Sequence, residues 1–292
     1  MLVQNLRNIS RENQHLFWFA TDQPESCNSN WTTPIEYIFN SRGFRDREWP
    51  SDLSNVVWFV GGSELLGTGV AYQHAPPRVV ESLTQRRCID ISIQRASNNW
   101  IARQVHNILD SDVSPKNIVI QWSFTTRWEL DKQQAQDQEL EWLYQAIRLE
   151  NWPKQIKSFS DYKKLSKEIQ DAVAQDDYFQ KICKMTGAEE SGQIHYKQDL
   201  LFDWAGAKHT LDLVKQIEQK KNFTQIVYTF VPKFAEPDER DFVYNELDKI
   251  GATYIPEYDQ IDLARDNSHS GPETFKLFGK DIATKIKNYD LK

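Results

Sequence analysis

Residues 55–63, NVVWFVGGS, decide the fold because they join an apolar strand to a sharp exit. The run Val56–Val60 is apolar and rich in residues that favour β-structure, which predicts a strand buried on both faces. Gly61 and Gly62 follow directly and predict a tight turn at its end. Ser63 then stands where the chain would turn from the strand into a helix.

Outward from this strand, strand and helix patterns alternate with short connections. Helices are predicted at 76–87, 97–110, 205–220, 237–250 and 271–289, and strands at 88–92, 117–123, 223–231 and 252–255. Ser97 is the expected cap of the second helix. Such alternation is typical of strand–helix–strand units that build a parallel sheet. The sequence therefore predicts an α/β, three-layer sandwich with a five-stranded parallel sheet.

The 292 residues are expected to form one domain with two additions. Residues 1–52 mix polar and aromatic residues without a long period and are interpreted as an N-terminal extension. Residues 124–204 are charged and rich in Gln, and their helical patterns predict a helical insertion within the domain. The α/β pattern resumes after the insertion.

Composition excludes several classes of protein. Asp and Glu number 42 against 35 Lys and Arg, a net charge of −7 that argues against a nucleic-acid-binding protein. The longest apolar runs, such as Val56–Val60, are far shorter than the roughly 20 residues that span a membrane. The first thirty residues show no signal-peptide pattern, so a cytoplasmic or virion-associated protein is expected. Cys27, Cys88 and Cys183 are widely spaced, which favours neither a disulfide framework nor a zinc site.

Two sets of polar residues follow predicted strands. In a parallel sheet, ligands bind beyond the carboxyl ends of the strands. Ser63 follows the first strand, and Asp266 and His269 lie in a loop after the fifth. Together they could form a nucleophile, a general base and a group that orients the base. The alternative interpretation is a plain turn with a helix-capping Ser and a helix-capping Asp beside a surface His.

The motifs resemble those of SGNH (GDSL-type) hydrolases. That family carries Gly-Asp-Ser after its first strand and Asp-x-x-His before its last helix. VVWFVGGSELLGTGV (56–70) is similar to the first motif, with Gly62 in place of Asp, and DNSHSGPETFKLFGKDIA (266–283) is similar to the second. NSRGFRD (40–46) resembles a lead-in to the first motif. The resemblance covers about 40–123 and 205–290, is divergent, and is greatest to phage-encoded and bacterial members. It implies a flavodoxin-like sandwich.

The middle motifs depart from the family pattern. In CIDISIQRASNN (88–99), Arg95 stands where the family has a Gly whose N–H stabilises the oxyanion. The family's Asn donor is missing after the third strand, where Gln121, Ser123 or Thr125 could donate instead. The resemblance thus implies an oxyanion hole formed by Ser63, Arg95, Ser123 and Thr125.

Trp122 and Arg127, at the end of the third strand, could line the substrate site by stacking on a sugar or aromatic group. The alternative is that Trp122 belongs to the core and Arg127 pairs with Glu129.

Two functions stay open. The first is a serine hydrolase that cleaves a small-molecule or carbohydrate ester, such as an O-acetyl group, with Ser63, His269 and Asp266 and with no metal or organic cofactor. The second is a catalytically degenerate SGNH-like domain that serves as a binding or virion-associated structural module. Neither interpretation predicts a nucleic-acid or membrane partner.

Overall fold

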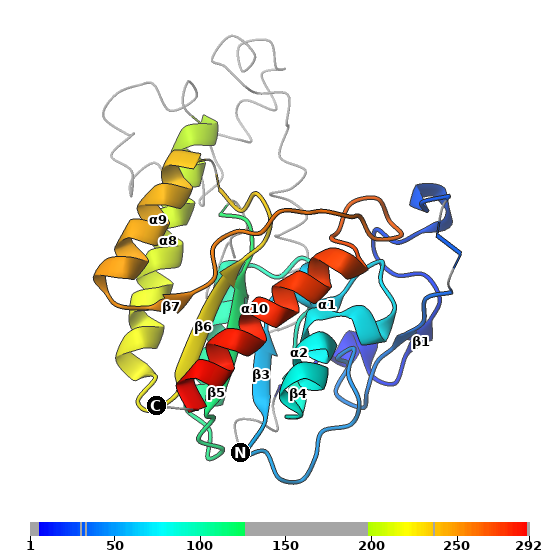
Figure 1. Cartoon of the computed structure of the whole chain (residues 1–292), viewed down its shortest axis with the longest axis horizontal. Coiled ribbons are helices and arrows are strands. Elements are labelled where there is room, and N and C mark those ends of the chain that lie inside the picture. The colour runs from blue at the N-terminus through cyan, green and yellow to red at the C-terminus, as the bar shows by residue number, and fades with distance from the viewer. Residues whose placement is uncertain (1–5, 30, 33, 126–197, 236, 291–292) are drawn as a thin grey trace, which may run out of the picture.

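Five parallel strands form the central sheet of the protein (Figure 1). The computed structural model describes residues 6–29, 31–32, 34–125, 198–235 and 237–290. The strands are β3 (Val57–Val60), β4 (Cys88–Asp90), β5 (Asn117–Trp122), β6 (Gln225–Phe230) and β7 (Thr253–Tyr254). Their order is β4-β3-β5-β6-β7, so the first strand of the sheet lies between the second and the third. This is the flavodoxin-like order, and it confirms the predicted five-stranded parallel sheet.

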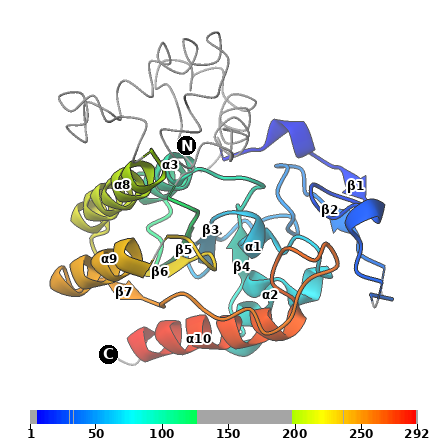
Figure 2. The same ribbon diagram turned by 90° about the horizontal axis from the view of Figure 1, so that it is seen from above.

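Helices cover both faces of the sheet (Figure 2). One layer consists of α2 (Pro76–Thr84) and α10 (Pro272–Asp290), and the other of α3 (Asn98–Leu109), α8 (Gln198–Lys220) and α9 (Pro237–Lys249). The side chains of β3 alternate between the layers, because Val57 and Phe59 pack with α2 and α10, whereas Trp58 packs with α3 and α8. The three-layer sandwich follows from this alternation.

The helix ends follow from local chemistry. Pro76 and Pro77 begin α2, where a missing N–H costs no hydrogen bond. The Ser97 hydroxyl accepts a hydrogen bond from the Trp100 N–H at 3.1 Å, which confirms Ser97 as the cap of α3. A short helix, α1 (Ser63–Leu66), follows β3 and ends at Gly67, whose left-handed φ of +74° favours glycine. The sharp exit from β3 is therefore a four-residue helical turn.

The N-terminal extension packs against the sandwich. It contains an antiparallel pair, β1 (His15–Leu16) and β2 (Tyr37–Ile38), and two 3-10 helices, Ile9–Arg11 and Pro24–Ser26; a third 3-10 helix, Tyr72–His74, precedes α2. Phe19, Tyr37 and Phe39 form an apolar cluster with Leu66 of α1. The extension is thus joined to the helix that carries Ser63.

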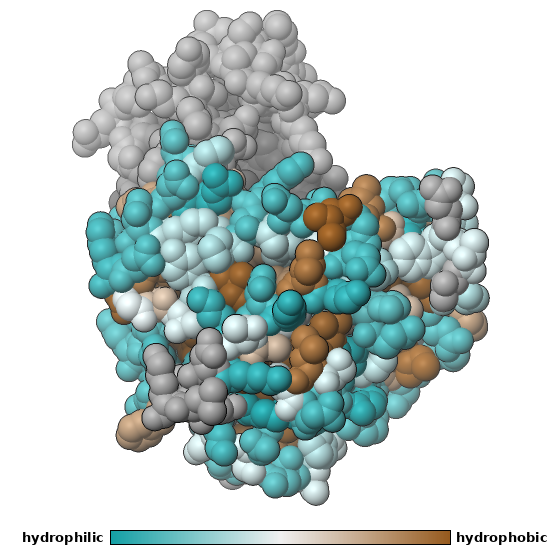
Figure 3. Space-filling model, viewed as in Figure 1, coloured by the Kyte–Doolittle hydropathy of each residue, from teal (hydrophilic) through white to brown (hydrophobic). Residues whose placement is uncertain are grey.

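Most of the predicted insertion, residues 126–197, lies outside the described residues. The helix predicted at 205–220 is confirmed as α8, which begins earlier, at Gln198. No helix in the described ranges combines the length and the apolar character needed to cross a bilayer. The face over α10 is largely hydrophilic, with apolar side chains scattered across it (Figure 3). Leu277 of α10 and Ile261, in the loop before that helix, are exposed.

Candidate active site

Ser63 lies at the carboxyl end of β3, where the strand order reverses. It is the first residue of α1 and follows Gly61 and Gly62 directly. A Cβ on Gly61 would lie 3.0 Å from the Cβ of Gln121 and 2.8 Å from Leu65 Cδ1. Glycine therefore allows the chain to leave β3 close over β5 and to place Ser63 above the sheet.

The structure brings Ser63, His269 and Asp266 together in one hydrogen-bonded chain. The Oγ atom of Ser63 lies 2.7 Å from Nε2 of His269, and Nδ1 of His269 lies 2.6 Å from Oδ2 of Asp266. When Nδ1 carries the proton and donates it to Asp266, a neutral His269 has Nε2 as an acceptor for the Ser63 hydroxyl. The Ser63 residue is 8% exposed. The set has the geometry of a nucleophile, a base and an orienting carboxylate.

Asp266 is buried and held by four hydrogen bonds. Its Oδ1 accepts the backbone N–H groups of Ser268 and His269, and its Oδ2 accepts Nδ1 of His269 and the hydroxyl of Thr21 at 2.6 Å. Burial by itself raises the pKa of this carboxyl, but the hydrogen bonds and the charge of His269 outweigh it and bring the pKa to about 2. Asp266 is therefore ionised at neutral pH.

A second carboxyl, that of Glu64, is buried beside the nucleophile. It accepts the backbone N–H of Ser270 at 3.3 Å, which ties α1 to the segment that follows His269. Burial raises the pKa of Glu64, and the nearby His269 acts in the opposite direction. Glu64 thus links the two segments that carry the Ser and the His.

Arg45 fixes the loop that follows α1. Its buried guanidinium donates to the carbonyl groups of Leu66 at 3.2 Å, Gly67 at 2.5 Å and Val70 at 2.9 Å. The same group lies 4.2 Å from the ring centroid of Tyr37. The lead-in 40–46, noticed in the sequence only as a resemblance, therefore supports the Ser63 turn physically.

The backbone at Arg95 keeps a conformation that suits glycine. Its φ is +57°, in the left-handed region that side chains seldom adopt. The neighbouring Gln94 amide donates to the Thr68 hydroxyl in the loop after α1. Arg95 therefore lies in a segment that is anchored beside the Ser63 turn.

Ser123 and Thr125 have their backbone donors engaged elsewhere. The N–H of Ser123 donates to Oδ1 of Asn98 at 2.8 Å. The N–H and the hydroxyl of Thr125 both donate to the carbonyl of Phe234, at 3.1 Å and 3.4 Å. In this arrangement Thr125 has no donor left for an oxyanion.

Trp122 does not line a substrate surface, so that expectation is wrong. Its side chain is fully buried and stacks on Tyr228 with ring centroids 6.4 Å apart. Even-numbered side chains of β5 point toward α3 and α8, as Ile118 and Ile120 do, and Trp122 follows the same alternation. Arg127 lies outside the described residues.

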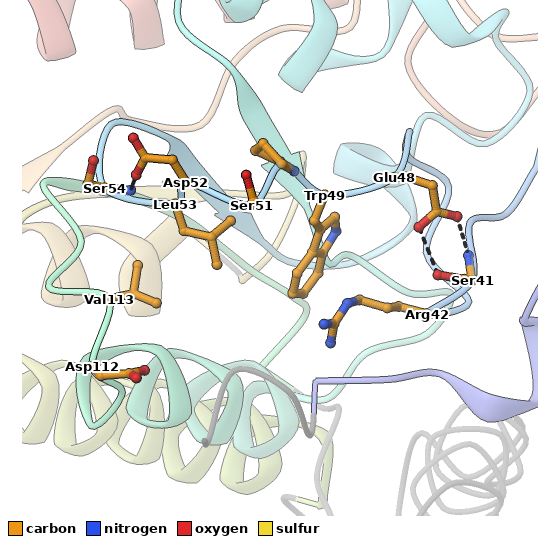
Figure 4. A pocket seen from close by; sticks show the side chains of 11 residues that line it. Ser41, Arg42, Glu48, Trp49, Ser51, Asp52, Leu53, Ser54, Asp112 and Val113 are labelled. Carbon is orange, nitrogen blue, oxygen red and sulfur yellow. Dashed lines mark hydrogen bonds between the residues drawn. The ribbon is translucent and has the colours of Figure 1, made fainter.

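A separate cavity of about 640 Å³ lies at the other edge of the sheet (Figure 4). Residues 50–54, which lead into β3, and Val113, which precedes β5, line it, so it lies at the amino ends of the strands. Glu48 accepts the N–H and the hydroxyl of Ser41, and the Arg42 guanidinium lies 4.4 Å from the ring centroid of Trp49. Two of the polar residues that line this cavity, Ser41 and Glu48, thus pair with each other, away from Ser63.

In the part of the chain that the structure describes, no three His, Cys, Asp or Glu side chains are grouped as metal ligands would be.

Comparisons with known proteins find similarity only at the level of structure. No family model matches the sequence, and no curated protein matches it. A lipolytic protein of the G-D-S-L family from Desulfitobacterium hafniense DCB-2 is 10% identical, with 79% of this chain and 98% of that chain covered and a TM-score of 0.43. A family two carbohydrate esterase from Clostridium thermocellum is 12% identical, with 83% of this chain and 66% of that chain covered and a TM-score of 0.42. The psychrotrophic esterase EstA from Pseudoalteromonas sp. is 10% identical, with 82% of this chain and 100% of that chain covered and a TM-score of 0.38.

Proposed function

We propose that this chain is a serine hydrolase of ester substrates, of the SGNH type that its motifs resemble. Ser63 is the nucleophile, His269 the general base and then acid, and Asp266 the group that orients the imidazole. The observation that carries the proposal is the unbroken hydrogen-bond chain through these three side chains, 2.7 Å and 2.6 Å long at its two links.

The reaction proceeds in two halves. His269 Nε2 takes the proton of Ser63 as Oγ bonds to the ester carbonyl carbon, and the imidazolium then protonates the leaving alcohol oxygen as its bond to that carbon breaks. His269 then deprotonates a water molecule as the water oxygen bonds to the acyl carbon. The bond from that carbon to Ser63 Oγ breaks, Oγ takes the proton back from the imidazolium, and the acid is released. Ester and water become alcohol and acid, and no metal or organic cofactor takes part. Ionised Asp266 stabilises the imidazolium in both halves.

The oxyanion would be stabilised mainly by backbone donors. The N–H of Ser63 lies in the first turn of α1, where N–H groups have no partner within the helix. The left-handed backbone of Arg95, as at a glycine, supports a second donor there. The Ser123 N–H and both Thr125 donors are engaged elsewhere, and the loss of one oxyanion donor typically costs about 10²–10³ in turnover. We therefore expect a slower enzyme than one with the complete family set.

The substrate class we propose is an acetyl ester, carried by a small molecule or a carbohydrate. The 8% exposure of Ser63 leaves little of the nucleophile accessible, which favours a small acyl group. A Cβ at position 62 would have no atom of the described residues within 4 Å, so these residues leave open space directly beside the nucleophile. An acetyl group can enter such a space, whereas a long acyl chain needs an apolar channel.

Binding without turnover is the second candidate function. The observation that favours it is the engagement of both Thr125 donors by Phe234, together with the absence of the family's Asn after β5. In that case the Ser63 site would hold an acylated ligand without cleaving it, as a binding or virion-associated module would.

Hydrolysis of p-nitrophenyl acetate and of acetylated sugars by wild type and Ser63→Ala separates the two functions. The esterase proposal predicts turnover by wild type and its loss in Ser63→Ala. The matched control is Ser82→Ala, which removes an exposed hydroxyl on α2 that bonds only a backbone carbonyl within that helix. A folded wild type that hydrolyses none of these esters contradicts the enzyme and favours the binding module.

A further inference from the structure

The N-terminal extension reaches the catalytic set through Thr21. The Thr21 hydroxyl donates to Oδ2 of Asp266 at 2.6 Å, across 245 residues of sequence. The same oxygen faces Nδ1 of His269 at 2.6 Å. Thr21 is thus two hydrogen bonds from the imidazole and three from the nucleophile.

The neighbouring residue anchors this contact. Asp22 is fully buried and pairs with Arg265, with 2.7 Å between Nε and Oδ1 and 2.5 Å between Nη2 and Oδ2. Tyr37 donates its hydroxyl hydrogen to Asp22 at 2.6 Å and accepts the N–H of Gly69 at 2.8 Å. A bidentate ion pair next to Thr21 therefore fixes the extension to the loop that holds Asp266.

Further contacts fix Arg265 itself. Its guanidinium donates to the carbonyl of Phe17 at 2.9 Å and lies 4.0 Å from the ring centroid of Trp18. Its backbone N–H donates to the carbonyl of Gly69, in the loop after α1. Residues 17–22 therefore surround the side chain of Arg265, the residue before Asp266. These contacts define the position of the Thr21 hydroxyl.

We propose that Thr21 is a positioning residue of the Ser63–His269–Asp266 set, which acts by holding the Asp266 oxygen that meets the imidazole. Asp266 Oδ1 is fixed by two backbone N–H groups, whereas Oδ2 depends on His269 and Thr21 alone among the described residues. When the imidazole rotates or becomes charged during the reaction, the Thr21 hydroxyl keeps this oxygen in place. The extension is therefore part of the active site.

Thr21 is exposed, whereas Asp266 is only 4% exposed. Replacing the hydroxyl by a methyl group therefore leaves the core unchanged and removes one donor from a buried carboxylate. Thr21→Val has nearly the same shape as wild type, and Thr21→Ser keeps the hydroxyl. Thr32→Val is the matched control, because Thr32 is also an exposed threonine of the extension.

This proposal rests on the proposed esterase function for its kinetic test. With p-nitrophenyl acetate, kcat of Thr21→Val should fall about tenfold, at the low end for one hydrogen bond to a charged group. KM and the melting temperature should stay at the values of Thr32→Val, and Thr21→Ser should restore kcat. If kcat of Thr21→Val equals that of wild type, or if it falls and Thr21→Ser does not restore it, the proposal is overturned.

A spectroscopic measurement tests Thr21 even if the protein is no esterase. The Nδ1 proton of His269 gives a low-field resonance in protein labelled with ¹⁵N-histidine, assigned by its disappearance in His269→Ala. Its position should move in Thr21→Val and stay in Thr21→Ser and Thr32→Val. An unmoved resonance in Thr21→Val overturns the positioning role. If wild type is inactive and the resonance moves in Thr21→Val, the esterase function is overturned and the positioning role of Thr21 is supported.

Discussion

The Nε2 atom of His269 lies 2.7 Å from the Oγ atom of Ser63, although 206 residues separate the two in sequence. Their meeting follows from the topology of the sheet. Ser63 leaves β3 at its carboxyl end, and the loop with His269 runs from β7 back across the same edge before α10 begins. Parallel strands place all such exits at one edge, so residues distant in sequence become neighbours there.

Loss of either reacting side chain should abolish ester hydrolysis. Ser63→Ala and His269→Ala should each lower kcat/KM by on the order of 10³-fold or more and to similar extents, because the two groups act as one unit. The fall in kcat/KM should be about two orders of magnitude smaller for Asp266→Asn, since the nucleophile and the base remain. The measurement is p-nitrophenyl acetate turnover with thermal melts alongside, and all three variants should remain folded. Activity of His269→Ala equal to that of wild type would contradict the base assignment.

Alanine should leave the stability unchanged at one glycine near the nucleophile, Gly62, and should lower it at another, Gly69. Gly62→Ala should keep the wild-type melting temperature, because its Cβ would meet no described atom within 4 Å. Gly69→Ala should be clearly less stable, because φ is +76° and the Cβ would lie 2.8 Å from Ala264 Cβ and 3.2 Å from Asp266 Oδ1. It should also lower activity by displacing Asp266. Equal melting temperatures for the two variants would contradict this description of the loop after α1.

Arg95→Gly should raise esterase activity without loss of stability. The change keeps the backbone N–H and removes the long side chain from a position proposed for the oxyanion hole. It also relieves the left-handed backbone, which costs about 1–2 kcal/mol unless the residue is Gly. Gln85→Gly is the control, because Gln85 has a φ of +58° at the end of α2. It should gain stability without gaining activity. Unchanged activity in Arg95→Gly would remove Arg95 from the proposed site.

Asp90 should make the wild-type protein less stable as the pH rises. Burial raises the pKa of Asp90 from its ordinary 3.8 to about 7, although hydrogen bonds from Ser92 act to lower it. The folded protein therefore holds a proton that the unfolded chain has lost. This contribution is complete below about pH 4 and is lost as the pH rises through about 7.

Asp90→Asn keeps an oxygen for the Ser92 N–H and removes the ionisation. The free energy of unfolding of wild type minus that of Asp90→Asn should be larger at pH 5 than at pH 8. Chemical denaturation at both pH values measures it, with Asp52→Asn at an exposed position as the control. A difference that is the same at both pH values would contradict the raised pKa.

Much of the fold could be predicted from local sequence. Short apolar strands, a Pro start and a Ser cap are encoded within a few residues, so the five strands and their helices lie where expected. The sequence also indicates Ser63, Asp266 and His269 as neighbours, because residues that follow parallel strands share one edge of a sheet. Their distances required the structure.

The orientation of Trp122 could not be predicted in the same way. A strand buried on both faces is apolar throughout, so its composition does not indicate which side chains point to which layer. The contact between Thr21 and Asp266 was also beyond prediction, because it joins residues 245 apart and neither neighbourhood carries a motif for it. Only the packing of the extension on the loop before α10 brings the two together.

Covalent labelling by a fluorophosphonate probe tests the central claim most directly. The probe reacts with a serine whose hydroxyl is activated by a neighbouring base, whether or not the natural substrate is known. Peptide mass spectrometry should find the label on Ser63 in wild type, none in Ser63→Ala, and much slower labelling in His269→Ala. A folded wild type that stays unlabelled at Ser63, while a known serine esterase reacts in the same mixture, would contradict the claim that Ser63 is an activated nucleophile.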